Sequence, residues 1–173
     1  LILINNEFNC LNSFFKSHPQ WLPQVYGKGA VNQSGHETAF FLGQWMEDYK
    51  EFHLTRDRGR TEVVVWGGDG SKAYFKTKNM FPVYGKIATI LTALYNIDTF
   101  EQIWPWHHAA GDFIIKKAGA DFDVKLITIR GLKNLTEFPG HTPENKSFRW
   151  PALLFYFLNM TLRVRLDRLN GTG

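Results

Sequence analysis

The chain has 173 residues, of which 44% are hydrophobic and 16% aromatic, a composition that excludes a disordered segment and can build a core. The formal net charge of +4 permits an anionic partner such as a nucleotide, but it is too small for the basic stripe of a dedicated DNA-binding protein. The single cysteine, Cys10, excludes a disulfide framework, so we expect a reducing, cytoplasmic location. The longest apolar run starts at Pro151 and is too short to span a bilayer, so we expect no membrane partner. The absence of an initial Met suggests a piece of a longer protein.

The first predicted element is a helix over residues 5–17. Its apolar side chains recur at three- and four-residue spacing and so share one face: Phe8, Leu11, Phe14 and Phe15. Asn5 or Asn6 can cap the first turn, and the helix should end before Pro19, because the residue before a proline avoids helical backbone angles. Cys10 lies in this apolar helix without an activating neighbour and is interpreted as a core residue.

Strand-like segments follow this helix. "WLPQVYGKG", from Trp21, and the first half of "TAFFLGQWMEDYKEFHL", from Thr38, are rich in β-forming residues. "TEVVVW" and "SKAYFK" flank "GGDG", a pattern that favours a β-hairpin. The letters "GGDGSK" also suggest a phosphate-binding loop, but that loop has a glycine where this sequence has Ser71, so the hairpin is favoured.

The middle of the chain predicts a helix and then a second hairpin. The helix covers residues 84–96, with an apolar face formed by Ile87, Ile90, Leu91 and Leu94. Asp98 and Glu101 have the spacing of a capping box, which predicts a short helical turn that ends at Pro105. "DFIIKKAGADFDVKLITIRG" then predicts two strands around a turn at Gly119.

The last part of the chain predicts a loop over residues 131–149 and a helix that starts near Pro151 and ends at Gly171. We expect its buried side to be the apolar set at helical spacing: Leu154, Phe157, Leu158, Thr161, Leu162, Leu166 and Leu169. Arg163 and Asp167 are four residues apart and can pair on its surface.

The segment "WPWHHAAGDF", from Trp104, holds the residue types most suited to chemistry. His107 and His108 are adjacent and project in different directions, so they do not form a two-histidine metal site. His108 and Asp112 can meet in a turn, but two ligands do not make a site. Asp112 sits at a loop-to-strand junction, where a carboxylate can orient a substrate hydroxyl or simply close a turn after Gly111.

Two charged groups elsewhere have alternative interpretations. Glu47, Asp48, Glu51 and His53 fall within seven residues and can share a metal, although such a run is more typical of a solvated segment leaving a strand. The arginines of the last helix, at positions 163, 165 and 168, can bind phosphate or form a surface face near the helix C-terminus.

Five segments occur in a recognisable order along the first 130 residues. "NEFNCLNSFFKSHPQWLPQVYGKG" precedes "TAFFLGQWMEDY", and "YGKIATILTALYNIDTF" precedes "WHHAAGDFIIK" and "FDVKLITIRG". This order resembles a kinase-like phosphotransferase of the aminoglycoside-phosphotransferase and protein-kinase superfamily. The resemblance implies an α+β, kinase-like fold: incomplete N-lobe strands and a hinge over residues 1–54, a hairpin insertion over 55–83, and a mostly helical C-lobe with a small β-hairpin over 84–173.

The same resemblance implies ATP and Mg as cofactors and transfer of the γ-phosphate to the hydroxyl of a small-molecule acceptor. Asp112 would orient that hydroxyl, and His108 would support the catalytic loop. Glu7 would pair with a nucleotide-binding lysine. The hinge that meets the adenine would be formed by the residues from Gln44 to Asp48, among them Trp45, Met46 and Glu47.

Several positions depart from the family pattern. Three residues separate His108 from Asp112 where the family has one; Lys117 replaces a metal-binding Asn, and Thr128 and Arg130 replace a metal-binding Asp. Because magnesium neutralises charge on the transferring group, such a chain would transfer phosphate poorly. An inactive kinase-like or unrelated α+β module that binds a protein partner is therefore an alternative. A third hypothesis, nucleic-acid binding through "KAYFKTKNMFPVYGK", is the least favoured.

Overall fold

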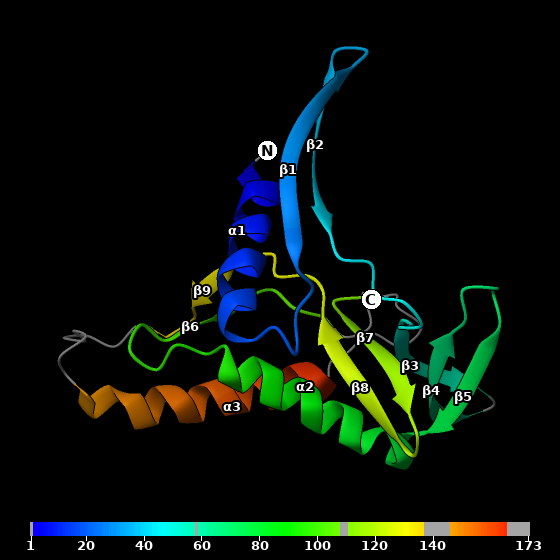
Figure 1. Ribbon diagram of the computed structural model, residues 1–173. Coiled ribbons are helices and arrows are strands. Elements are labelled where there is room, and N and C mark those ends of the chain that lie inside the picture. Colours follow the sequence, from blue (N-terminus) through cyan, green and yellow to red (C-terminus); the bar gives the residue numbers. More distant parts are fainter. Residues whose placement is uncertain (1, 58, 108–110, 137–145, 166–173) are drawn as a thin grey trace.

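The computed structural model describes residues 2–57, 59–107, 111–136 and 146–165. At positions 57, 164 and 165 only the backbone is described. The described residues mix helices with small antiparallel sheets, which confirms the expected α+β class. Figure 1 shows a long hairpin and a helix beside it that project from a body made of the other elements, with two further helices on the side away from the hairpin.

The projecting hairpin consists of β1 (Val25–Gln33) and β2 (His36–Gly43), which pair antiparallel around a turn at Ser34 and Gly35. Both turn residues have positive φ, 54° and 83°, the backbone region in which glycine carries no steric cost. Most side chains of the outer half of the hairpin are exposed on both faces. The hairpin is therefore supported mainly at its base.

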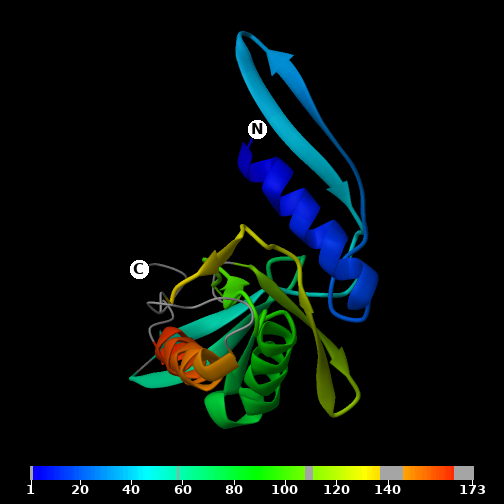
Figure 2. The ribbon, with the colours of Figure 1, turned by 90° about the vertical axis from the view of Figure 1, so that its left-hand side faces the viewer.

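Helix α1 (Ile2–Ser17) lies beside the base of this hairpin, as Figures 1 and 2 both show. Phe8 packs edge-to-face on Phe41 with ring centroids 6.3 Å apart, and Leu11 is fully buried. The predicted end before Pro19 is confirmed. The predicted cap is wrong, because the helix starts at Ile2 and Asn5 and Asn6 lie inside it.

A three-stranded antiparallel sheet follows, formed by β3 (Phe52–Asp57), β4 (Arg60–Trp66) and β5 (Lys72–Lys76). The hairpin predicted around "GGDG" is confirmed as the β4–β5 connection, where the Asp69 carboxylate accepts the Ser71 N–H at 3.0 Å. A short 3-10 helix, η1 (Thr77–Met80), leads from this sheet into α2 (Phe81–Ala93). The predicted apolar face of α2 is buried.

A second pair of strands was not predicted. The capping-box spacing of Asp98 and Glu101 suggested a helical turn, but β6 (Glu101–Ile103) is a strand that pairs with β9 (Leu132–Asn134). That partner lies thirty residues further along the chain, so local sequence gives no sign of it. The hairpin predicted around Gly119 is confirmed as β7 (Phe113–Ala118) with β8 (Asp121–Leu126).

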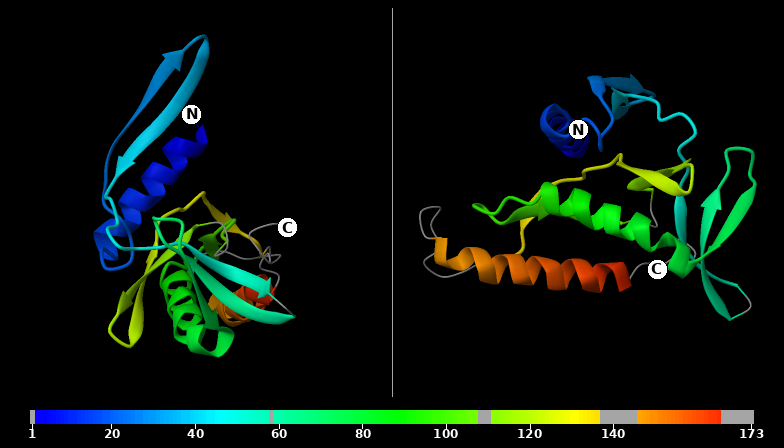
Figure 3. Two further views of the ribbon diagram at one scale, coloured as in Figure 1. Left: turned by 90° about the vertical axis from the view of Figure 1, so that its right-hand side faces the viewer. Right: turned by 60° about the horizontal axis from the view of Figure 1, so that its bottom comes forward.

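Helix α3 (Arg149–Arg165), preceded by the 3-10 turn η2 (Lys146–Phe148), lies beside α2 (Figure 3). Tyr156 stacks on Tyr95, just after α2, with centroids 4.5 Å apart. The predicted buried side of α3 is wrong: Leu154, Phe157, Leu158 and Leu162 are exposed, and Ala152, Tyr156 and Met160 are buried instead. Both sides of the helix carry apolar residues, so periodicity alone selected the wrong one. The expected partner Asp167, like Leu166 and Leu169, lies outside the described residues.

The hydrophobic core lies where α2 meets β7, β8 and the three-stranded sheet. Phe52, Val63, Ile87, Phe113 and Leu126 are each 1% exposed or less. The backbone of Lys50, just before β3, bridges to Ile115 in β7 and so joins the three-stranded sheet to the β7–β8 hairpin. This junction fixes the surroundings of Asp112, which immediately precedes β7. No helix among the described residues is long and apolar enough to cross a membrane.

Candidate functional site

Asp112 is fully buried at the start of β7 and forms an ion pair. One carboxylate oxygen, Oδ2, accepts hydrogen bonds from the His107 backbone N–H at 2.6 Å and from the Arg130 guanidinium at 2.5 Å. The other oxygen, Oδ1, is also buried and has no hydrogen-bond partner among the described residues. The carboxylate therefore ties the 104–107 segment to the chain that follows β8.

Burial is the largest influence on this carboxyl group and raises the pKa of Asp112, because a charged carboxylate loses its hydration in the interior. The hydrogen bonds from Arg130 and from the His107 N–H, together with the positive charge of Arg130, act in the opposite direction. An acid whose pKa is perturbed by burial and by one specific partner is typical of functional sites and also of structural ion pairs.

Helix α1 completes the surroundings of this pair. Asn6 donates its side-chain N–H to the Arg130 carbonyl oxygen at 3.1 Å. Burial raises the pKa of Glu7, the positive charge of Arg130 lowers it, and the negative charge of Asp112 raises it again. The structure thus brings together two predicted site residues, Glu7 and Asp112, around an arginine that was not predicted to join them.

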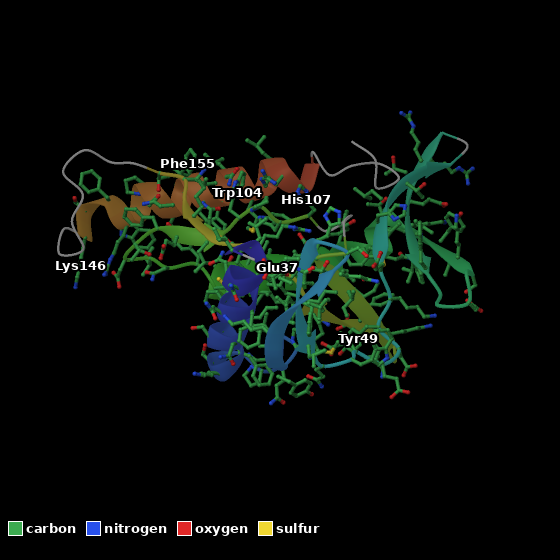
Figure 4. The ribbon with its side chains drawn as sticks, turned by 90° about the horizontal axis from the view of Figure 1, so that it is seen from above. Glu37, Tyr49, Trp104, His107, Lys146 and Phe155 are labelled. Atoms are coloured by element: carbon green, nitrogen blue, oxygen red, sulfur yellow. The ribbon has the colours of Figure 1, made fainter. Side chains whose placement is uncertain are left out.

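The two tryptophans of "WPWHHAAGDF" each pack on another side chain of the protein. Trp106 is buried and packs edge-to-face on Phe113 at 6.3 Å. The Arg163 guanidinium of α3 lies over the Trp104 ring, 3.5 Å from its centroid. Figure 4 labels Trp104 and His107. His107 is partly buried, with its N–H on Asp112. The predicted catalytic-loop residue His108 lies outside the described residues.

A cavity of about 300 Å³ opens beside this pair, along the segment that follows β2. Its lining includes Gln44, Trp45 and Met46 from that segment, and Ile114 and Ile127 from β7 and the chain just after β8. The rest of the lining comes from the base of the β1–β2 hairpin and the segment before β3: Pro23, Phe41, Gly43, Tyr49 and Glu51. Of the five residues predicted to form a nucleotide hinge, Gln44, Trp45 and Met46 line this cavity, whereas Glu47 and Asp48 are not among its lining residues.

The cavity adjoins the Asp112 ion pair through two contacts. Ile127, in the cavity wall, donates its backbone N–H to the Asp112 carbonyl oxygen at 2.8 Å. Gly111 has a φ of 73° and lies against Glu51, so that a Cβ atom at position 111 would be 3.1 Å from Glu51 Oε1. A side chain here would both strain the backbone and push on the cavity wall.

The segment from Gln44 to Tyr49 is held by hydrogen bonds at both ends, whereas backbone groups near its middle have no hydrogen-bond partner among the described residues. At one end the Gln44 N–H donates to the Gln24 carbonyl oxygen at 2.7 Å; at the other the Tyr49 hydroxyl donates to Asp123 in β8. Lys116 reaches the Glu47 carbonyl oxygen at 3.4 Å. Within the part of the chain that the structure describes, the backbone N–H and C=O groups of Trp45 make no hydrogen bond.

Few metal-ligating side chains surround Asp112 among the described residues. Among the described residues, no three His, Cys, Asp or Glu side chains are placed to hold a metal ion. The charged group closest to the carboxylate is the cation Arg130. Lys117 and Thr128, which the resemblance predicted to replace metal ligands, supply neither a carboxylate nor an amide.

Sequence reasoning missed the residues that complete the site: Arg130, Ile114, Ile127 and Tyr49. The sequence does contain one sign of the role of Arg130. This charged residue directly follows the mainly apolar run "LITI", and a charge next to buried residues usually has a partner of opposite charge. The isoleucines are ordinary strand residues, and only the hairpin register places them at the cavity. No family model, curated protein or solved structure matches the chain.

Proposed function

We propose that this chain is a nucleotide-binding domain of phosphotransferase type, which holds the base of ATP in the cavity beside Gln44, Trp45 and Met46. The observation that supports this most is the composition of that cavity. Gln44, Trp45 and Met46, from the segment whose backbone was expected to meet adenine, line this cavity together with Ile114 and Ile127, two isoleucines close to Asp112.

The chemistry of the cavity suits a flat, partly polar ring. Its volume of about 300 Å³ is near the lower end of the range for small-molecule sites, about 300–1,000 Å³, which suits a base and leaves the phosphates outside. Met46, Ile114 and Ile127 supply apolar contact for the faces of the ring. The open backbone groups of Trp45 can pair with its edge.

Trp45 is the residue through which this proposal is tested most directly. Its side chain is 87% exposed at the edge of the cavity, so removing it costs little folding stability. An exposed indole can stack on a base, and such stacking contributes about 1–3 kcal/mol per base. We assign Trp45 the role of covering the bound base.

The roles of the two acids follow from their exposure. Glu51 lines the cavity and is exposed, so its carboxylate can meet an acceptor hydroxyl. Asp112 is the acid that the resemblance assigns to that task, but here its Oδ2 is paired with Arg130 and its Oδ1 is buried. We therefore propose that Asp112 positions the segment beside the cavity.

The test is calorimetric titration with ATP, ADP and adenosine, with and without magnesium, on the wild type and on Trp45→Ala. We expect measurable binding to the wild type and about tenfold weaker binding to Trp45→Ala, which corresponds to 1.4 kcal/mol. Tyr74→Ala removes an aromatic side chain that is 53% exposed on β5, away from the cavity, and should bind like the wild type.

A folded wild-type chain that binds none of the three ligands would refute the proposal and leave the non-enzymatic interaction module. Binding without phosphate transfer to any hydroxyl acceptor would retain the nucleotide site and reject the activity. If transfer is observed, its loss in Glu51→Gln but not in Asp112→Asn would support the assignment of the acceptor-facing acid.

A further inference from the structure

Helix α3 exposes a row of large apolar side chains four residues apart. Trp150, Leu154, Leu158 and Leu162 are 78%, 62%, 56% and 57% exposed, and we call these four residues the α3 ridge. Phe155 and Phe157, 44% and 41% exposed, flank it. A spacing of four places the members of a ridge one above the other along one side of a helix.

The orientation of α3 is fixed by contacts on its other side. Tyr156 stacks on Tyr95, Arg163 lies over Trp104, and Arg149 donates to Asp98. Asn159 donates to Gln102 at 3.4 Å. These contacts are spread from the first to the last turns of the helix, so it cannot rotate to bury the ridge without losing them.

The exposed face is apolar and uncharged. No charged residue occurs between Trp150 and Leu162, and the arginines on either side are held by the contacts on the packed face. From the exposed fractions of the ridge and its two flanking phenylalanines, the apolar surface is about 700 Å². Monomeric soluble proteins rarely expose so large a contiguous apolar patch.

We propose that two copies of this chain associate through their α3 ridges, with the helices antiparallel and a two-fold axis between Leu154 and Leu158. In this register Leu154 of one copy meets Leu158 of the second, and Trp150 meets Leu162. The spacing of four makes the row self-complementary, as a symmetric dimer interface requires. Ridges of this spacing interdigitate with helices crossing at about −50°.

The area and the charge favour a second copy over other occupants. Two faces of about 700 Å² bury about 1,400 Å² in total, within the usual range of specific interfaces. An uncharged face meets no like-charge repulsion when it faces its own copy. Helices that bind lipid surfaces carry lysines and arginines along the side opposite the apolar face, and here that side packs on the protein. Helix α3 lies on the side of the body opposite the β1–β2 hairpin (Figure 1).

The test measures mass by light scattering over a range of protein concentrations. We expect a dimer for the wild type and a dissociation constant about 100-fold higher for Leu158→Glu, because the variant buries a charge at the centre of the interface. Leu42→Glu, at a 60% exposed position on β2, is the matched control and should remain dimeric. Circular dichroism and thermal midpoints show whether each variant is folded.

A double variant tests the antiparallel register. Leu154→Lys with Leu158→Glu places opposite charges face to face only in the proposed arrangement, so part of the lost association should return and weaken with salt. A wild type that stays monomeric, or a dimer that Leu158→Glu leaves unchanged, would overturn the proposal. Binding of the monomer to phosphatidylcholine–phosphatidylserine vesicles, abolished by Leu158→Glu, would assign the ridge to lipid and also overturn it.

Discussion

The two ends of the β7–β8 hairpin carry ion pairs of nearly equal length in opposite environments. At the base, Asp112 and Arg130 are 2.5 Å apart and the carboxylate side chain is 1% exposed. At the turn, Asp121 and Lys86 are 2.6 Å apart, and their side chains are 54% and 41% exposed. Burial raises the pKa of Asp112, whereas the hydrogen bond from Lys86 lowers the pKa of Asp121.

This comparison shows that distance does not set the energy of an ion pair. At the turn, water solvates both charges, so their attraction is weak and little is lost when one is removed. At the base, the carboxylate has given up its hydration and depends on Arg130 and on one backbone N–H. The base of the hairpin should therefore tolerate substitution far less than its turn.

The largest effect is expected from Arg130→Met, which leaves the buried Asp112 without its cation. We expect a loss of about 3 kcal/mol in the free energy of unfolding, at the lower end of the range for broken buried pairs because Arg130 is 36% exposed. Urea denaturation measures this loss. The double variant Asp112→Asn/Arg130→Met should be more stable than Arg130→Met alone, and equal stability would show that the carboxylate does not depend on the arginine.

The second effect is a pH dependence that belongs to Asp112. Because its pKa is higher in the folded than in the unfolded chain, the folded state binds the proton more tightly. Stability should therefore fall as the pH rises from the ordinary value of 3.8 through the raised folded value. The measurement is the difference between the urea-unfolding free energies of the wild type and Asp112→Asn across this interval. If the wild type instead became more stable relative to Asp112→Asn as the pH rises through this interval, the pKa of Asp112 would be lowered on folding, not raised.

The smallest effect is expected from Lys86→Met at the turn. The ammonium also reaches the Phe122 carbonyl oxygen, but both charged groups remain in contact with water. The change in urea midpoint should be a small fraction of that of Arg130→Met and should vanish in about 1 M salt, where screening is strong. A loss as large as that of Arg130→Met would show that the two ends of the hairpin are energetically alike.

The local elements of the fold could be predicted from the sequence where the pattern is short-range. Periodicity located the apolar face of α2, and glycine turns located the β4–β5 and β7–β8 hairpins. The pairing of β6 with β9 joins distant segments, and no local pattern encodes it. The face of α3 was misassigned because both sides of the helix carry apolar residues and the side richer in leucine is the exposed one.

The candidate site shows the same division between local and distant information. Asp112 was identified from its position at a loop-to-strand junction, and Gln44, Trp45 and Met46 from the resemblance. The same cavity is also lined by Ile114 and Ile127, and the β7–β8 register, not any local pattern, brings these two residues close together. The pairing of Asp112 with Arg130 spans 18 residues and follows from that register too.

The projecting β1–β2 hairpin has a mechanical consequence. Its base borders the cavity through Phe41 and Gly43, while its turn lies a full strand away, about 27 Å for eight residues. A rotation of about 10° at the base would move the turn by about 5 Å over that length. A small tilt at the cavity would therefore displace the tip of the hairpin much further than its base.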